Sequence, residues 1–146
     1  MRAGLIFVAA LIIILIASCT KDKEKSLRYF EVGIKGSQED WRDSSFVVAT
    51  ADQQLINTIM EQLKKPITAR QIVMGELASG SGGYNKNAGY SFNWHFIENK
   101  WGLVDVSAEI YDGRAYSDVD KDPDYWLGTL KRFSPWGSYI KKEIIK

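Results

Sequence analysis

The apolar and polar positions of the first half of the chain predict a strand–strand–helix–strand order. Residues 27–34 (LRYFEVGI), 46–49 (FVVA) and 70–78 (RQIVMGELA) are β-rich runs, and residues 36–44 form a polar loop between the first two. After the second run, apolar residues recur with the period of an α-helix. These residues are Leu55, Ile56, Ile59, Met60 and Leu63.

The predicted helix has recognisable ends. Asp52 is a favourable N-cap residue. Lys64 and Lys65 place positive charge in the last turn, where it suits the helix dipole, and Pro66 cannot continue the helix. We therefore predict a helix from Asp52 to Lys65.

Two later segments, residues 90–98 and 103–111, alternate apolar and polar side chains and predict a β-hairpin. Each segment has one apolar face, and both faces are expected to meet the same core. Because a shift of one residue would turn one face outward, the register must pair Phe96 with Val104. Residues 99–101 then form the connecting loop.

The polar face of this hairpin would bring titratable side chains together. It places His95 opposite Asp105 and Asn93 opposite Ser107, with Glu109 one pair further along. Three interpretations follow: a Ser–His–Asp arrangement for acid–base catalysis, a metal site on the histidine and the acids, or a solvated cross-strand cluster. The serine lacks the Gly-x-Ser-x-Gly turn of a hydrolase and no second histidine is present, so the third is favoured.

Aspartates at alternate positions form a second candidate site. Asp118, Asp120 and Asp122 resemble part of a calcium loop, but Pro123 stands where the EF-hand pattern requires glycine. Helix capping is the simpler interpretation, with Asp122 as N-cap and Pro123 at the first helical position. We therefore predict a short C-terminal helix here and retain the three aspartates only as weak calcium candidates.

These elements predict an α+β fold. We expect an antiparallel sheet of about five strands packed by one main helix, with a short C-terminal helix, in a single domain over residues 27–146. Residues 79–89 (SGSGGYNKNAG) lack the glycine spacing of a phosphate-binding loop and are expected to form a mobile or partner-facing loop.

The N-terminus resembles the signal peptide of a bacterial lipoprotein. Arg2 is followed by an apolar run over residues 5–16 and by a lipobox-like motif that ends at Cys19. The run is too short to span a bilayer and has the features of a cleaved signal. We predict removal of residues 1–18, lipidation of Cys19, for example with palmitate, and a polar tether over residues 19–26. This places the protein on a membrane of the bacterial cell envelope, at the outer membrane or cell surface if the cell is Gram-negative.

Charge and cysteine content narrow the possible functions. The chain has 19 basic and 18 acidic residues, and signal removal takes one basic residue, so the mature protein is nearly neutral. Neutrality without a basic run argues against a nucleic-acid partner. Cys19 is the single cysteine, so lipidation leaves none for a disulfide, and the domain must be stabilised by its core.

Four further motifs lie at residues 46–52 (FVVATAD), 90–96 (YSFNWHF), 112–114 (DGR) and 132–139 (RFSPWGSY). Together they resemble a family of small secreted domains of bacteria and slime moulds, whose bacterial members are often labelled calmodulin-binding protein. The resemblance covers roughly residues 45–144 and implies a helix that opens with an acid after the first motif. Where family members carry paired cysteines, this chain has Tyr111 and Ser134. No basic amphipathic helix of the calmodulin-target kind is present.

We expect a lipid-anchored, non-enzymatic module that binds a protein or peptide partner. Its membrane contact would be made through Cys19, and no cofactor is implied. One alternative is a glycan-binding module, which an exposed row of Tyr84, Tyr90 and Trp101 would favour. The other is a metal-assisted or acid–base enzyme centred on His95, which a pocket at that histidine would favour.

Overall fold

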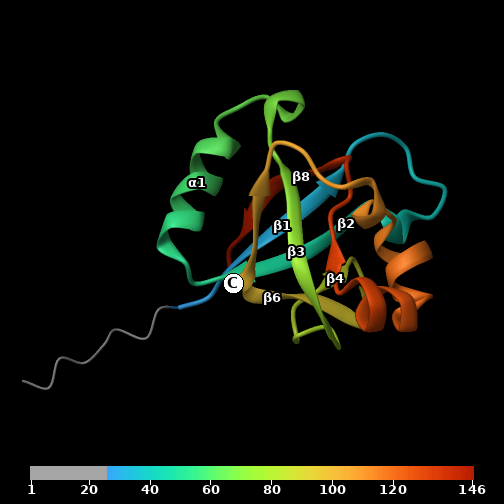
Figure 1. Ribbon diagram of the computed structural model, residues 1–146. Coiled ribbons are helices and arrows are strands. Elements are labelled where there is room, and N and C mark those ends of the chain that lie inside the picture. The colour runs from blue at the N-terminus through green and yellow to red at the C-terminus, as the bar shows by residue number, and fades with distance from the viewer. Residues whose placement is uncertain (1–25) are drawn as a thin grey trace, which may run out of the picture.

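The computed structural model describes residues 26–146, which form an α+β fold as predicted (Figure 1). The elements in chain order are β1 (Arg28–Ile34), η1 (Trp41–Asp43), β2 (Ser45–Thr50), α1 (Gln53–Leu63), η2 (Ile67–Ala69), β3 (Ile72–Ser79), β4 (Lys86–Asn87), β5 (Tyr90–Ser91), β6 (Trp94–Val104), η3 (Glu109–Tyr111), η4 (Ala115–Asp120), η5 (Asp124–Leu130), β7 (Arg132–Phe133) and β8 (Ser138–Ile144). The predicted signal peptide and Cys19 lie outside the described residues. Within those residues, no helix is long and apolar enough to span a bilayer.

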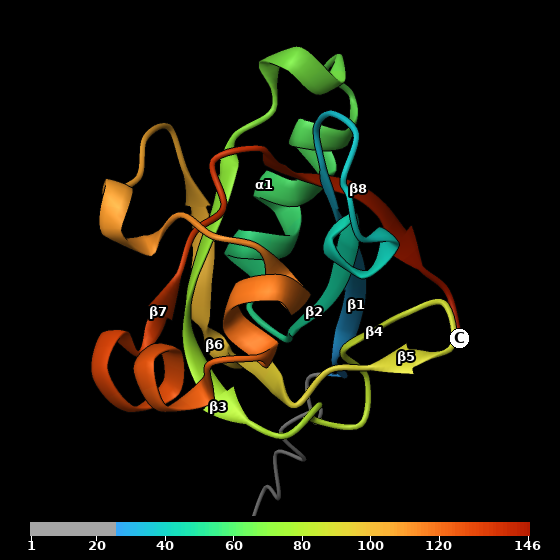
Figure 2. The same ribbon diagram turned by 90° about the vertical axis from the view of Figure 1, so that its right-hand side faces the viewer.

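The strands form two three-stranded antiparallel sheets and a two-stranded ribbon, so the single five-stranded sheet was wrong. The first sheet has the order β2-β1-β8 and the second β6-β3-β7, while β4 pairs with β5. Side chains from both sheets share one core. Its largest fully buried members are Trp94, Phe30, Phe46, Phe92, Phe96 and Phe133. Figure 2 shows the two sheets on either side of this core.

Side-chain hydrogen bonds join the two sheets where strand pairing stops. On one side, the Val73 amide of β3 donates to Ser138 Oγ of β8 at 2.9 Å. On the other, Asn85 Oδ1 accepts from the Val47 amide of β2 at 2.9 Å, and Asn85 Nδ2 donates to the Trp94 carbonyl of β6 at 2.8 Å. Asn85 lies in the glycine-rich segment, which is therefore part of the folded core and not simply a partner-facing loop.

Helix α1 forms as its sequence predicts. Asp52 Oδ1 accepts hydrogen bonds from the amides of Gln54 (2.8 Å) and Leu55 (3.3 Å), and Lys64 follows the last helical residue. The apolar face buries Ile56 and Ile59 against the shared core. The contacts that define this helix are local, which explains why the periodicity and the caps located it correctly.

The predicted hairpin after residue 90 was wrong, because β6 continues straight through its expected loop. β6 pairs along its length with β3, and residues 97–100 bulge out where the register shifts between Gly75 and Leu77. Trp101, expected in the loop, is buried, and its indole Nε1 donates to the Ala49 carbonyl at 2.7 Å. Burying this large aromatic side chain is more favourable than exposing it in a turn.

The C-terminal region contains the predicted short helix and one strand that the pattern did not predict. η5 occupies Asp124–Leu130, and the chain then returns as β8, which pairs with β1. β8 carries a bulge, since Glu31 pairs with Lys142 and the next residue of β1 pairs with Ile140. The extra residue places Lys141 and Lys142 on the same face, which removes the alternation that would indicate a strand.

Candidate functional site

The structure does not bring His95 and Asp105 together. In the register of β3 and β6, His95 pairs near the end of β3, whereas Asp105 follows the residue that pairs with its start. Six residues of strand separate these two levels, which corresponds to about 20 Å. Asp105 Oδ1 accepts instead from Gln71 Nε2 at 2.9 Å, and His95 Nδ1 lies 2.6 Å from the Gly80 carbonyl oxygen.

The other members of the predicted polar stripe also lie apart. The amide of Asn93 donates to Asp120 Oδ1 at 2.6 Å. Ser107 lies in the coil after β6, and Glu109 opens η3. Within residues 26–146, no three metal-ligating side chains lie close enough to hold one ion. The catalytic and metal arrangements that depended on the hairpin therefore have no common site in this fold.

The three calcium candidates are each held by a different contact. Asp118 accepts a hydrogen bond from the Arg114 amide at 2.7 Å. Asp120 accepts from the Tyr90 hydroxyl, and Asp122 accepts at 3.3 Å from an amide in the first turn of η5. The capping contact predicted for Asp122 is therefore present.

The exposed aromatic side chains are not those named for glycan binding. Tyr84 and Trp101 are only 4% and 7% exposed, so they form no surface row with Tyr90. Trp41 and Trp136 are instead about half exposed, at 54% and 48%. The surface around Trp41 is the more elaborate of the two, because an ionic and aromatic cluster supports it.

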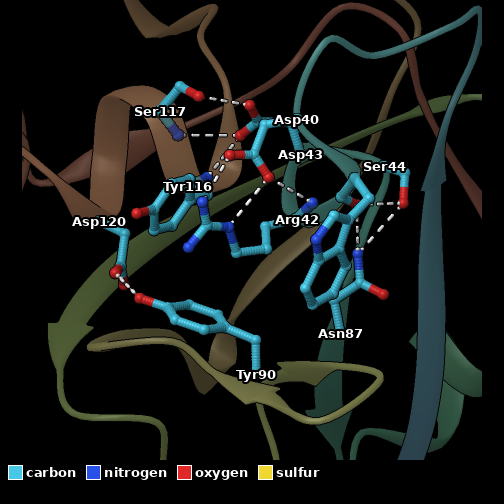
Figure 3. Close-up of polar contacts among 10 residues, drawn as sticks. Asp40, Arg42, Asp43, Ser44, Asn87, Tyr90, Tyr116, Ser117 and Asp120 are labelled. Atoms are coloured by element: carbon cyan, nitrogen blue, oxygen red, sulfur yellow. Dashed lines mark hydrogen bonds and ion pairs between the residues drawn. The ribbon is translucent and has the colours of Figure 1, made fainter.

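That cluster is centred on Arg42 and is drawn in Figure 3. The guanidinium makes two hydrogen bonds with Asp40, from Nε to Oδ1 at 2.9 Å and from Nη2 to Oδ2 at 2.7 Å. Its central carbon lies 3.5 Å from the ring centroid of Tyr116, 5.4 Å from that of Tyr90 and 5.9 Å from that of Trp41. We call these five residues the Arg42 cluster, in which one cation contacts three aromatic rings.

Asp43 builds the platform beneath this cation. Its buried carboxylate accepts from the amides of Tyr116 (2.7 Å) and Ser117 (2.9 Å) and from the Ser117 hydroxyl (2.6 Å). These bonds satisfy the free amides at the start of η4, a wide helical turn in which Val119 N donates to Arg114 O at 3.0 Å. Asp43 therefore fixes the Tyr116 ring under the guanidinium.

The cluster keeps one charge state at neutral pH. The hydrogen bonds from Arg42 lower the pKa of Asp40 to about 2, so its carboxylate is ionised. Burial, together with a hydrogen bond to Asp120, raises the pKa of Tyr90 to about 12, so its hydroxyl is neutral. The pattern treated residues 36–44 as an ordinary polar loop, and only the unusual Asp-Trp-Arg-Asp run marked it out.

A groove borders the cluster on the outer face of the β2-β1-β8 sheet. It has a volume of about 270 Å³. Its lining includes Tyr29, Glu31, Val47, Tyr84, Lys86, Asn87, Ile144 and Lys146. We call it the β1 groove. Asn87 joins it to the Arg42 cluster, because Asn87 Nδ2 donates to the Trp41 carbonyl at 2.8 Å and to Ser44 Oγ at 3.1 Å. Figure 2 shows the β4–β5 ribbon beside the C-terminal end of β8, the two sides of this groove.

The β1 groove carries net positive charge. Burial opposes ionisation of Glu31, but hydrogen bonds from Lys141 and Lys142 outweigh it and hold the pKa of Glu31 below its usual value. The two Nζ–Oε distances are 2.8 and 3.4 Å. Two lysines thus surround one carboxylate, and Lys86 and Lys146 add two further positive charges.

The fold and this face define a small α+β domain with an aromatic and basic surface. Residues 27–146 match the family model of the BP-74 N-terminal domain, and the chain belongs to this family. This match fits the resemblance to a calmodulin-binding-protein-like family. Neither the curated proteins nor the solved structures contain a match to the chain.

The structure also explains the two positions where the resemblance implied paired cysteines. Ser134 N donates to Tyr111 O at 2.8 Å, so the two residues lie side by side. Ser134 Oγ also donates to the Val73 carbonyl at 3.2 Å. Hydrogen bonding and packing hold these segments together in this chain.

Proposed function

We propose that this protein is a lipid-anchored module of the bacterial cell envelope that binds a protein or peptide partner through Trp41 and the Arg42 cluster. The observation that carries this proposal is the half-exposed Trp41 beside a preorganised arginine and two tyrosines. Tryptophan, tyrosine and arginine dominate the binding energy of protein interfaces. A side chain that is already held in place also loses little entropy on binding.

The membrane anchor rests on the N-terminal motif. Cys19 would carry the lipid, for example palmitate, and residues 19–26 would link it to β1. Wild-type protein should incorporate an alkyne-tagged fatty acid in the native cell and fractionate with membranes. Cys19→Ser should lose the label and leave the membrane fraction, whereas a labelled Cys19→Ser protein would contradict the anchor.

The binding site is tested by photocrosslinking in the native cell. A benzoylphenylalanine in place of Trp41 should give a discrete protein adduct in the envelope fraction, identified by mass spectrometry. The control position is Ile67 on η2, which is 44% exposed and outside the Arg42 cluster. The same adduct from both positions, or none from Trp41, would contradict the proposed site. An adduct that contains polysaccharide and no protein would favour the glycan alternative.

A further inference from the structure

We propose that the β1 groove binds a short acidic peptide segment of the partner, with one apolar side chain inserted between flanking carboxylates. The inference rests on the proposed function and names the chemistry of the partner. Because Asn87 lies in both the groove wall and the contact with Trp41, one ligand can reach both features.

The size and floor of the groove suit a single apolar side chain. Its volume of about 270 Å³ is smaller than most small-molecule sites, which occupy roughly 300–1,000 Å³. Val47 and Tyr84 are buried on this outer face of the sheet, and Tyr29 and Ile144 pack against them. This second apolar cluster lies apart from the main core and remains open to a ligand from above.

The rim of the groove favours carboxylates. Lys86 and Lys146 line it directly. The bulge in β8 adds Lys141 and Lys142, whose side chains are 48% and 63% exposed although both contact Glu31. A single carboxylate cannot neutralise four ammonium groups, so the surface attracts negative charge.

The same contacts argue against a sugar or a cation in the groove. Tyr84 is almost fully buried and makes an edge contact with Tyr29, with ring centroids 5.5 Å apart. The Tyr29 ring is covered by Lys146, whose Nζ lies 3.7 Å from the centroid. No ring face in the groove is therefore free for a sugar to stack on, and a cationic ligand would be repelled by the lysines.

The test measures peptide affinity by fluorescence anisotropy with residues 20–146, which contain every described residue. The probe is a fluorescein-labelled Glu-Glu-Glu-Leu-Glu-Glu-Glu peptide. Replacing all its glutamates with glutamine should weaken binding at least tenfold, and replacing leucine with glycine should weaken it about fivefold or more. Binding should also weaken with added salt. Equal affinity for the three peptides would overturn the proposal.

Matched charge reversals locate the site. Lys86→Glu combined with Lys146→Glu should lower affinity for the acidic peptide at least tenfold. The control combines Lys64→Glu and Lys65→Glu, which change the net charge equally at the end of α1 remote from the C-terminus (Figure 1). Thermal melts should show that both double variants remain folded. Equal loss of affinity in the two double variants would overturn the groove as the site.

Two further outcomes separate this inference from the proposed function. If an oligogalacturonate binds more tightly than the peptide and depends on Lys86 and Lys146, the groove binds an acidic glycan and the peptide proposal is wrong. If the crosslinked adduct at position 41 persists in the Lys86→Glu, Lys146→Glu variant while peptide binding is absent in the wild type, the acidic-peptide inference fails and the proposed function stands. If the wild type gives no adduct, the proposed function itself fails.

Discussion

One buried amide side chain holds the seam between β2 and β6, and changing it is the most direct test of this fold. Asn85 is 0% exposed. Its side chain accepts from the Val47 amide at 2.9 Å and donates to the Trp94 carbonyl at 2.8 Å. Asn85→Ala removes both bonds and leaves two backbone groups buried without these partners.

The expected effect on stability is large. Each buried backbone group that loses its partner destabilises the fold by about 1–3 kcal/mol. We therefore expect Asn85→Ala to lower the free energy of unfolding by about 4 kcal/mol, a substantial part of the roughly 5–15 kcal/mol of a typical domain. In a domain of this size the Tm should fall by roughly 10–20 °C.

The assay is urea unfolding of residues 20–146, followed by tryptophan fluorescence. The matched control is Asn87→Ala. Asn87 Nδ2 also makes two hydrogen bonds, to Trp41 O at 2.8 Å and to Ser44 Oγ at 3.1 Å, but at an exposed position. Water can replace those bonds, so we expect a loss below about 1 kcal/mol. Equal losses in the two variants would refute the argument that burial makes the Asn85 bonds important.

The nearly isosteric Asn85→Asp variant tests the same seam through pH. Only a protonated carboxyl can donate to the Trp94 carbonyl, so folding should raise the pKa of the new group above its unfolded value of about 3.9. The variant should then be most stable below that unfolded pKa and lose stability as the pH rises through its folded pKa. Urea midpoints at about pH 4 and about pH 7 measure this, and a difference from wild type that does not depend on pH would contradict it.

Three other predictions concern packing, covalent geometry and titration. Gly75→Ala should lower stability by about 2–3 kcal/mol in a thermal melt, because a methyl group there lies 2.6 Å from a core side-chain atom. Gly102→Ala, with nothing within 4 Å, should change it by less than about 0.5 kcal/mol. Tyr111→Cys combined with Ser134→Cys should form a disulfide that adds about 2–3 kcal/mol in melts without reductant. Because folding raises the pKa of Tyr90 to about 12, its neutral form should stabilise the protein below about pH 10 and lose that effect as the pH rises through about 12. An absorbance titration of Tyr90→Phe should then lack a component near pH 12.

The sequence predicted the elements that depend on neighbouring residues. The helix α1 was located by its apolar period and by Asp52, because both signals act within a few turns. β1, β2 and β3 were also located, since their β-branched and alternating residues suit a pleated surface in any pairing. The short helix at Asp124–Leu130 follows from the capping pattern at Asp122.

The candidate site could not be predicted in the same way. The hairpin prediction placed His95 beside Asp105 because both segments alternate, but the sheet partner of β6 is β3. The Arg42 cluster joins residues 40–42 to Tyr90 and Tyr116, which no periodicity connects. The bulge that places Lys141 and Lys142 together also removed the alternation by which β8 would have been recognised.

The sequence alone therefore determined the local elements, the α+β class and the predicted lipid attachment at Cys19. The tertiary structure decided which strands pair, that Trp101 is buried, and that Asn85 closes the seam between the sheets. Local elements arise from propensities and caps that act over a few residues. The pairing and the site depend on burial and hydrogen bonding between segments far apart in the chain, and these become definite only when the whole core is assembled.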